Sequence, residues 1–234
     1  MDFSLQTVFV TGAAGNLGRA VAQAFAQRGA RLVLLDRDPA ALQRAYGADD
    51  ATRLTLAADL LDPQQVQAAV DQALQRFGRL DVLCNIAGGF RMGEAVHETS
   101  QATWDFLLDL NARTVVHMAR AVVPHMLAAG AGKVVNVAAA SATQGRAQMG
   151  AYCASKSAVM RLTEAMAMEL REHGINVNCV MPTIIDTPEN RAAMPSADPS
   201  RWVAPQDLAE VIVFLASPAA RALHGAALPV NGLS

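Results

Sequence analysis

The first forty residues contain the pattern that most constrains the fold of this chain. The apolar run Val8–Val10 leads into a glycine-rich turn ending at Gly18, and a helical pattern follows. Asp36 closes the next apolar run, about twenty residues beyond the turn. Glycines let a backbone approach a pyrophosphate closely, and free N–H groups at a helix N-terminus bind its charge. This order therefore predicts an α/β fold that starts with a dinucleotide-binding unit.

Short apolar runs alternate with helical patterns over the remaining chain, which predicts a doubly wound parallel sheet of seven strands (Rossmann-like) in a single domain, residues 1–234. Successive apolar residues indicate strands buried on both faces. The expected strands lie near Thr7–Val10, Leu32–Leu35, Leu54–Ala57, Val82–Asn85, Val134–Val137, Asn176–Val180 and Ala227–Val230. Long helices are expected from about Gln101 to Ala129 and from about Gly150 to His173. Pro188–Pro205 follows a strand end, where ligands bind in such folds, so we expect a substrate lid there.

Tyr152 and Lys156 are the residues with the clearest chemical potential. They lie four residues apart, so on a helix both side chains share one face. A phenol has a reference pKa near ~10. A neighbouring ammonium favours the phenolate, so we expect Lys156 to lower the pKa of Tyr152 and the pair to exchange a proton with a substrate oxygen. A Tyr one turn from a Lys is by itself an ordinary surface pair, and only the dinucleotide pattern favours catalysis here.

Together these motifs resemble those of the short-chain dehydrogenase/reductase family, and the resemblance covers essentially the whole chain. The family's cofactor turn has the form Thr-Gly-x-x-x-Gly-x-Gly. This chain keeps Thr11, Gly12 and Gly18 but has Asn16 at the middle glycine. Asn tolerates a left-handed backbone better than most residues, so we expect the turn to survive.

The resemblance implies NAD as the cofactor, with NADH preferred over NADPH. NADP-preferring members often carry a basic residue where this chain has Gly15, and the Asp36 carboxylate would repel the extra phosphate. Asn111 matches the Asn that holds a water in the family's proton relay, and Lys156 is expected to bind the nicotinamide ribose. Further cofactor contacts are expected from Leu17, Asp59, Leu60, Asn85, Ala87, Gly88, Tyr152, Pro182, Ile185 and Thr187.

The main departure from the family is Ala139, where a Ser usually donates to the substrate carbonyl. Losing one such donor typically costs ~10²–10³ in rate. Ser141 is a candidate substitute if the strand continues, displaced by roughly 6–7 Å along it. The alternative is a turn serine that caps the strand.

Alanine at this position also occurs in quinonoid dihydropteridine reductases, which this chain resembles most densely over residues 186–198 and at Trp202. Such an enzyme reduces a conjugated imine, whose charge spreads over the ring, so a Ser donor is less needed. Asn85 and Asn111 instead follow the general family pattern. We therefore expect an NAD(H)-dependent oxidoreductase acting on a small carbonyl or alcohol, with Tyr152 as general acid or base. A conjugated-imine reductase and a non-catalytic NAD-binding sensor or scaffold remain alternatives.

Candidate substrate contacts lie in loops and helix starts that follow strands. A pocket rich in Met and aromatic side chains suits a flat apolar or aromatic substrate. These candidates are Phe90, Met92, Met149, Met194 and Trp202. Arg91 and Arg191 are expected to be solvated surface residues.

Composition limits the partners. A net charge of -2 offers no general attraction for nucleic acid, and no apolar run reaches the ~18 residues of a membrane span. The three cysteines are scattered without metal spacing, so we expect no metal site and reduced thiols in a cytoplasmic protein. Hydrophobic residues make up 52% of the chain, and we expect part of this excess at subunit interfaces. The family resemblance implies a dimer or tetramer formed through the helices near 101–129 and 150–173.

Overall fold

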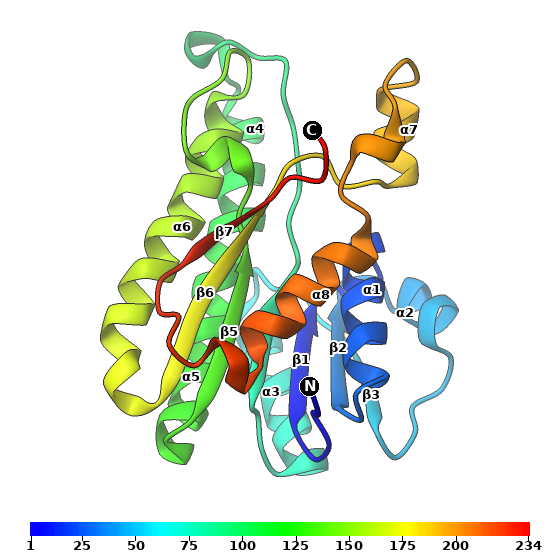
Figure 1. The fold of residues 1–234 in the computed structure, drawn as a ribbon, viewed down its shortest axis with the longest axis vertical. Helices are drawn as coiled ribbons and strands as arrows, with labels where there is room; N and C mark the ends of the chain where they lie inside the picture. The colour runs from blue at the N-terminus through cyan, green and yellow to red at the C-terminus, as the bar shows by residue number, and fades with distance from the viewer.

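The computed structural model describes residues 1–234 and is built on a parallel sheet with the strand order β3-β2-β1-β4-β5-β6-β7 (Figure 1). The strands are β1 (Thr7–Thr11), β2 (Arg31–Asp36), β3 (Arg53–Ala57), β4 (Val82–Asn85), β5 (Gly132–Val137), β6 (Ile175–Pro182) and β7 (Ala227–Val230). All seven predicted strands are confirmed, with ends shifted by a few residues. β1 pairs with both β2 and β4, so the chain reverses its direction across the sheet between β3 and β4. Ligands bind at such a switch point, beyond the carboxyl ends of the strands.

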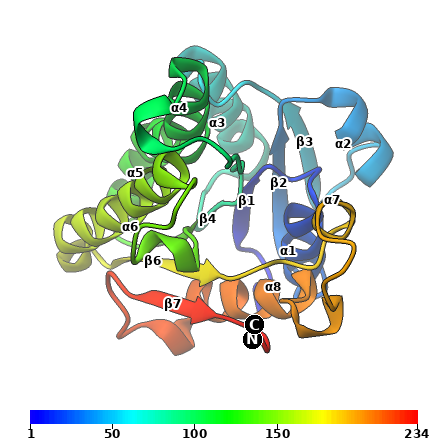
Figure 2. The ribbon, with the colours of Figure 1, turned by 90° about the horizontal axis from the view of Figure 1, so that it is seen from above.

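Helices cover both faces of the sheet (Figure 2). They are α1 (Asn16–Ala26), α2 (Pro39–Tyr46), α3 (Pro63–Phe77), α4 (Gln101–Leu108), α5 (Thr114–Ala129), α6 (Gly150–Leu170), α7 (Pro188–Ala193) and α8 (Pro205–Ala216). Val8 and Val10 of β1 belong to the core beneath α1 and α8, whereas Phe9 belongs to the core beneath α3, α5 and α6. This alternation within one fully apolar strand is what burial on both faces requires.

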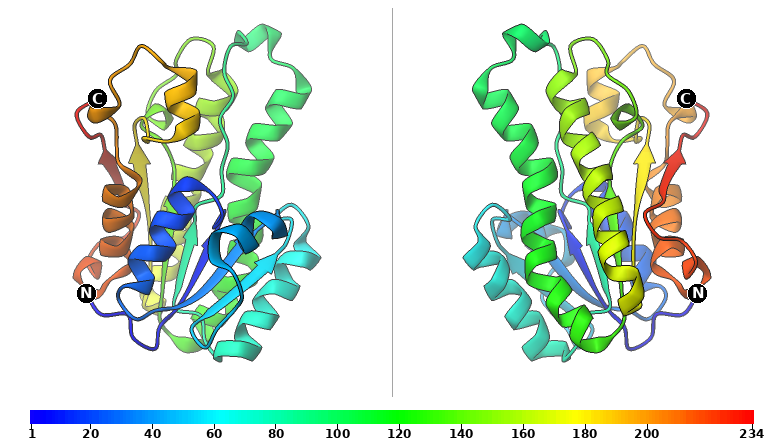
Figure 3. Two further views of the ribbon diagram at one scale, coloured as in Figure 1. Left: turned by 90° about the vertical axis from the view of Figure 1, so that its right-hand side faces the viewer. Right: turned by 90° about the vertical axis from the view of Figure 1, so that its left-hand side faces the viewer.

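The long helix expected from Gln101 to Ala129 is present but contains one π-helical turn, Asp109–Arg113, between α4 and α5. A π turn inserts a residue and redirects the side chains within it. Asn111 lies in this turn and is buried. The helix expected from Gly150 to His173 is α6, followed by a 3₁₀ turn at Arg171–His173. Figure 3 shows α5 and α6 side by side on one outer face.

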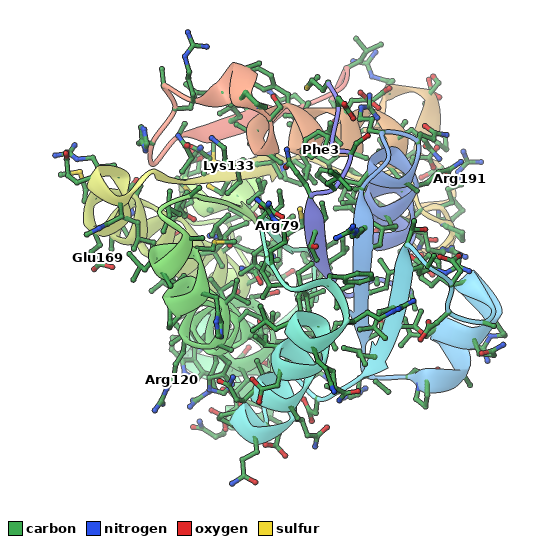
Figure 4. The ribbon with its side chains drawn as sticks, turned by 90° about the horizontal axis from the view of Figure 1, so that it is seen from below. Phe3, Arg79, Arg120, Lys133, Glu169 and Arg191 are labelled. Atoms are coloured by element: carbon green, nitrogen blue, oxygen red, sulfur yellow. The ribbon has the colours of Figure 1, made fainter.

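The end of the sheet where the strands begin is filled by structural contacts (Figure 4). Phe3 is fully buried, and its ring packs edge-to-face on Phe25 at 4.9 Å between centroids. Asp81 accepts hydrogen bonds from the Thr7 N–H and from Arg79. The residues at this end of the sheet are therefore engaged in packing and in ion pairs.

Residues 188–205 stand above α1 at the carboxyl ends of the strands (Figure 1). The segment contains α7 and a 3₁₀ turn at Pro199–Arg201. It leaves the sheet region at Ile185 and returns at Val203, where these two residues form an isolated parallel bridge. No helix in the structure has the length and apolar character needed to cross a bilayer.

Candidate active site

The glycine turn between β1 and α1 leaves no room for side chains at two positions. Gly12 has φ +62°, and a Cβ there would lie 2.8 Å from the Ala87 Cα atom. A Cβ on Gly18 would lie 2.1 Å from the Gly12 carbonyl oxygen. The Thr11 hydroxyl accepts hydrogen bonds from the Ile86 and Ala87 N–H groups at 3.0 and 3.1 Å, which fastens the turn to the segment after β4. Two of the predicted glycines are thus required by close backbone contact.

Asn16 differs from the sequence-based expectation. It is the first residue of α1 and has no positive φ, so tolerance of a left-handed backbone does not explain its presence. Its amide donates a hydrogen bond to the Glu189 carboxylate of α7 at 2.8 Å and accepts one from Arg19 at 2.9 Å. The pKa of the Glu189 carboxyl is lowered mainly by a hydrogen bond from the Glu189 backbone N–H. Asn16 and Arg19 lower it by smaller amounts. Asn16 therefore joins the start of α1 to residues 188–205.

The start of α1 and the end of β2 fit a dinucleotide. No side chain caps α1, whose N-cap residue is Gly15, and its first turn has no acidic residue, so its N–H groups are free for an anion. The Asp36 carboxylate accepts hydrogen bonds from the Ala14 and Asp38 N–H groups at 3.0 and 3.3 Å. These bonds fix its position and leave lone pairs for the ribose hydroxyls. Leu17 is buried beneath this turn.

The other predicted cofactor residues also lie at the carboxyl ends of strands. Asp59 and Leu60 follow β3, Pro182 ends β6, Ile185 follows it, and Thr187 caps α7. Asn85 ends β4 and donates to Asn136 of β5 at 2.8 Å. Asn136 in turn donates to Thr163 at 2.9 Å, so a buried polar chain fixes the two central strand ends.

Lys156 and Asn111 meet beside Gly88, which the family resemblance implies as a cofactor contact. Lys156 is almost fully buried on α6, and its Nζ donates to the Val137 carbonyl at the end of β5 at 2.9 Å. A Cβ on Gly88 would lie 3.1 Å from the Lys156 Nζ and 3.0 Å from the Asn111 Oδ1. The absence of a side chain at Gly88 thus opens this part of the site. Tyr152 lies one turn before Lys156 on the same helix.

Asn111 is held by hydrogen bonds on both sides of its amide. Its Oδ1 accepts from the Gly89 N–H at 2.9 Å, and its Nδ2 donates to the Gly89 carbonyl at 3.0 Å and to Ser155 Oγ at 2.9 Å. Ser155 Oγ donates to the Tyr152 carbonyl at 2.8 Å. Ser155 was missed by the sequence analysis. The only sequence signal for a role of Ser155 was its position directly before Lys156.

Burial sets the pKa values of the central pair. Burial raises the pKa of Tyr152 to about 12 and lowers the pKa of Lys156 to about 8. The prediction that Lys156 lowers the pKa of Tyr152 is wrong for this structure, because desolvation dominates and also disfavours the ammonium itself. With a pKa of about 12, the Tyr152 hydroxyl is protonated at neutral pH. It forms no hydrogen bond within the protein, so its O–H is free to donate.

The strand does not continue to Ser141. β5 ends at Val137, Ala139 is extended (φ -160°, ψ 156°), and Ala140–Ala142 form a 3₁₀ turn. The alternation that would place Ser141 on the same side as Ala139 therefore does not apply, and Ser141 is nearly buried within the turn. Its role as a substitute donor stays a prediction.

Three predicted substrate residues lie around Tyr152. The Phe90 ring packs edge-to-face on the Tyr152 ring, with centroids 4.8 Å apart and an interplanar angle of 87°. Met92 and Met149 line a small cavity together with Tyr152. Phe90 and Met92 are half exposed, so both present apolar surface beside the phenol.

The other two predicted substrate residues lie in the 188–205 segment. Met194 is partly buried at the end of α7. Trp202 is only 7% exposed, so in this conformation its ring packs inside the protein and the expected substrate contact is not supported. Arg191 pairs with Asp186 at 2.6 Å, and the Arg91 guanidinium lies 3.7 Å from the centre of the Phe106 ring. Both arginines are exposed, as expected, and each also has a partner within the protein.

Comparison with known proteins identifies the family. The short chain dehydrogenase profile matches residues 6–197. A D-threitol dehydrogenase from Mycolicibacterium smegmatis is 37% identical, covering 99% of this chain and 94% of its own length. Among solved structures, levodione reductase is 30% identical with a TM-score of 0.90, covering 98% of this chain and 97% of its own. A 3-ketoacyl-(acyl-carrier-protein) reductase from Brucella melitensis, complexed with NADH, is 33% identical with a TM-score of 0.87 and covers 98% of each chain. The chain belongs to the short-chain dehydrogenase/reductase family and is an NAD(P)-dependent oxidoreductase.

Proposed function

We propose that this enzyme transfers hydride between NAD(H) and a small carbonyl or alcohol substrate, with Tyr152 as the general acid or base. The observation that carries the proposal is the cluster of Tyr152, Lys156 and Asn111 at the carboxyl ends of β4 and β5. The glycine turn, which fits a pyrophosphate, borders the same sheet edge. The three relatives described above are a D-threitol dehydrogenase, a levodione reductase and a 3-ketoacyl-(acyl-carrier-protein) reductase, whose names state this class of chemistry.

The cofactor and the residues that bind it have separate roles in the reaction. NAD(H) supplies or accepts the hydride when it is bound. The N–H groups at the start of α1 would hold its diphosphate, and Asp36 would accept the ribose hydroxyls. The Asp36 carboxylate would repel the additional phosphate of NADPH, so we propose a preference for NADH.

Tyr152 is placed to donate a proton when a carbonyl is reduced. Its pKa of about 12 keeps the hydroxyl protonated, and its oxygen has no partner within the protein. Lys156 and Asn111 would bind the ribose and a relay water, and both are held rigidly by backbone contacts. A fixed donor is what general acid catalysis requires.

A second candidate function is the reduction of a conjugated imine such as a quinonoid dihydropterin. Ala139 favours it, because a buried methyl group cannot donate to a localised oxyanion. In a conjugated acceptor the developing charge is shared by the ring, so the missing donor matters less. Parallel turnover assays with NADH and the two acceptor classes separate the candidates.

We also propose a homo-oligomer in the cytoplasm. Val116 and Leu127 on α5 and Met168 on α6 are exposed apolar side chains. Figure 3 shows these two helices side by side on one outer face. Burial of this face against a second copy would remove them from water. The three free cysteines are buried, as expected for thiols in a reducing compartment.

The test of the catalytic role is Tyr152→Phe. The substitution removes only the hydroxyl, so NADH binding should remain within about twofold while kcat falls by roughly 10²–10⁴. NADH binding is measured by fluorescence titration and kcat by NADH oxidation. Unchanged kcat would refute the role of Tyr152, whereas absence of turnover in the wild type with every acceptor would favour the sensor or scaffold.

A further inference from the structure

The surface next to the Tyr152 hydroxyl is apolar and is held in place by the catalytic residues. Phe90 follows Gly89, whose N–H and carbonyl are both hydrogen-bonded to the Asn111 amide at 2.9 and 3.0 Å. The Phe90 ring then contacts the Tyr152 ring while remaining 52% exposed. The exposed part of the Phe90 ring therefore offers an apolar wall to a substrate that binds at Tyr152.

The chain beyond Phe90 extends this wall. The Gly93 N–H donates to the Gln148 carbonyl at 2.9 Å, which fastens the loop just before the start of α6. Val96 packs so closely on Gly150 that a Cβ there would lie 2.7 Å from the Val96 Cγ2 atom. Met92 and Val96 are 55% and 78% exposed, respectively. Scattered apolar residues are common on surfaces, but a contiguous set beside a catalytic group indicates a binding surface.

The charged side chains of the same loop are already engaged. Arg91 lies over the Phe106 ring at 3.7 Å. Glu94 accepts hydrogen bonds from the Ser100 N–H at 2.9 Å and from the Thr103 hydroxyl at 3.0 Å, which directs it toward the start of α4. The Thr99 and Thr103 hydroxyls, which line the small cavity beside Tyr152, donate to the Ala95 carbonyl and to the Glu94 carboxylate, and alanine stands at position 139. A substrate rich in hydroxyl groups would therefore exchange its water contacts for few free side-chain hydroxyl donors beside Tyr152.

We propose that the substrate is a cyclic, largely apolar ketone or alcohol, an alicyclic or aromatic ring whose face lies against Phe90 and Met92 with its oxygen at the Tyr152 hydroxyl. This inference rests on the proposed oxidoreductase function. In the reductive direction, the carbonyl carbon accepts hydride from NADH, the C=O π electron pair moves to oxygen, and that oxygen takes the Tyr152 proton. The ketone becomes an alcohol and NADH becomes NAD⁺. The reverse reaction oxidises the alcohol.

The test compares kcat/KM of the purified full-length enzyme for cyclohexanone with NADH, for cyclohexanol with NAD⁺, and for a linear four-carbon polyol with NAD⁺. Cyclohexanol should exceed the polyol by roughly a hundredfold. Phe90→Ala should lower kcat/KM for both cyclic substrates about tenfold, mainly through KM, whereas Phe90→Leu, which keeps an apolar wall, should retain most of it. Leu5→Ala, at an exposed apolar residue in the turn before β1 and at the opposite end of the strands, is the control and should change neither value.

The outcomes separate the inference from the function on which it rests. Preferred turnover of the polyol, or an unchanged ratio in Phe90→Ala with NADH binding intact, would overturn the substrate class but support NAD(H)-dependent catalysis. Absence of NADH-linked turnover with both substrate classes would overturn both. Preference for the cyclic substrates that is lost in Phe90→Ala and kept in Phe90→Leu supports the inference.

Discussion

Ala139→Ser should turn this enzyme into a better catalyst for isolated ketones. Ala139 lies on extended backbone two residues after β5 and is 6% exposed, so the new hydroxyl enters a nearly dry environment. One preorganised donor to an oxyanion contributes ~10²–10³ in rate. A hydroxyl that has not been optimised should recover part of this, so we expect kcat for an isolated ketone to rise by roughly tenfold to a hundredfold. Its neighbours Ala138 and Ala142 offer no side-chain partner, so the free energy of unfolding should fall by about 1–3 kcal/mol.

The assay is steady-state NADH oxidation with an isolated ketone and, in parallel, a quinonoid dihydropterin, with stability measured by urea unfolding. The gain should be confined to the ketone, because charge in the pterin is delocalised. Ala142→Ser places the same group in an equally buried position of the following turn and should change neither rate. An unchanged or lower ketone kcat in a folded Ala139→Ser variant would refute the reasoning about the missing donor.

Three further perturbations test other parts of the structure. Gly18→Ala places a Cβ 2.1 Å from a carbonyl oxygen, so NADH binding should weaken by at least about tenfold in a fluorescence titration; unchanged affinity would contradict the close contact. Glu189→Gln removes a negative charge next to the start of α1 while leaving an acceptor for Asn16, so the Kd for NADH should fall about threefold. Glu172→Gln, a similar change at the exposed 3₁₀ turn after α6, should leave that Kd unchanged. Burial lowers the pKa of Lys156 from 10.5 to about 8, so the folded state binds fewer protons than the unfolded chain between these pH values. The free energy of unfolding, relative to Lys156→Met, should therefore rise across this interval, because the titration of Tyr152 is common to both proteins and cancels in the difference. A flat or falling difference would show that Lys156 is not desolvated.

Much of the fold was predictable because its signals are local. Each buried strand is a run of apolar residues, and the glycine turn, with Asp36 at the right distance, marks the start of a doubly wound sheet. The parallel arrangement follows from helices between successive strands. The residues that follow these strands then meet at one end of the sheet. The grouping of Tyr152, Lys156 and Asn111, which lie on helical segments, was expected from the family pattern.

The features that sequence did not reveal depend on contacts between distant segments. The π turn at Asp109–Arg113 inserts one residue into an apolar helix, and the hydrophobic periodicity on either side does not show it. The bond between Asn16 and Glu189 joins residues 173 positions apart. The raised pKa of Tyr152 reflects how deeply its helix packs, which composition and spacing cannot give. Trp202 was expected to face a substrate, and only the packed structure shows that its ring is buried.

The most direct test of hydride transfer uses NADH with deuterium at both hydrogen positions of the nicotinamide C4 carbon, with cyclohexanone as acceptor and mass spectrometry of the product. Hydride transfer with Tyr152 as the proton donor predicts that the wild type forms an alcohol with deuterium on the former carbonyl carbon, and that Tyr152→Phe forms far less of it. An alcohol without deuterium, or equal product from the Tyr152→Phe variant, would contradict it.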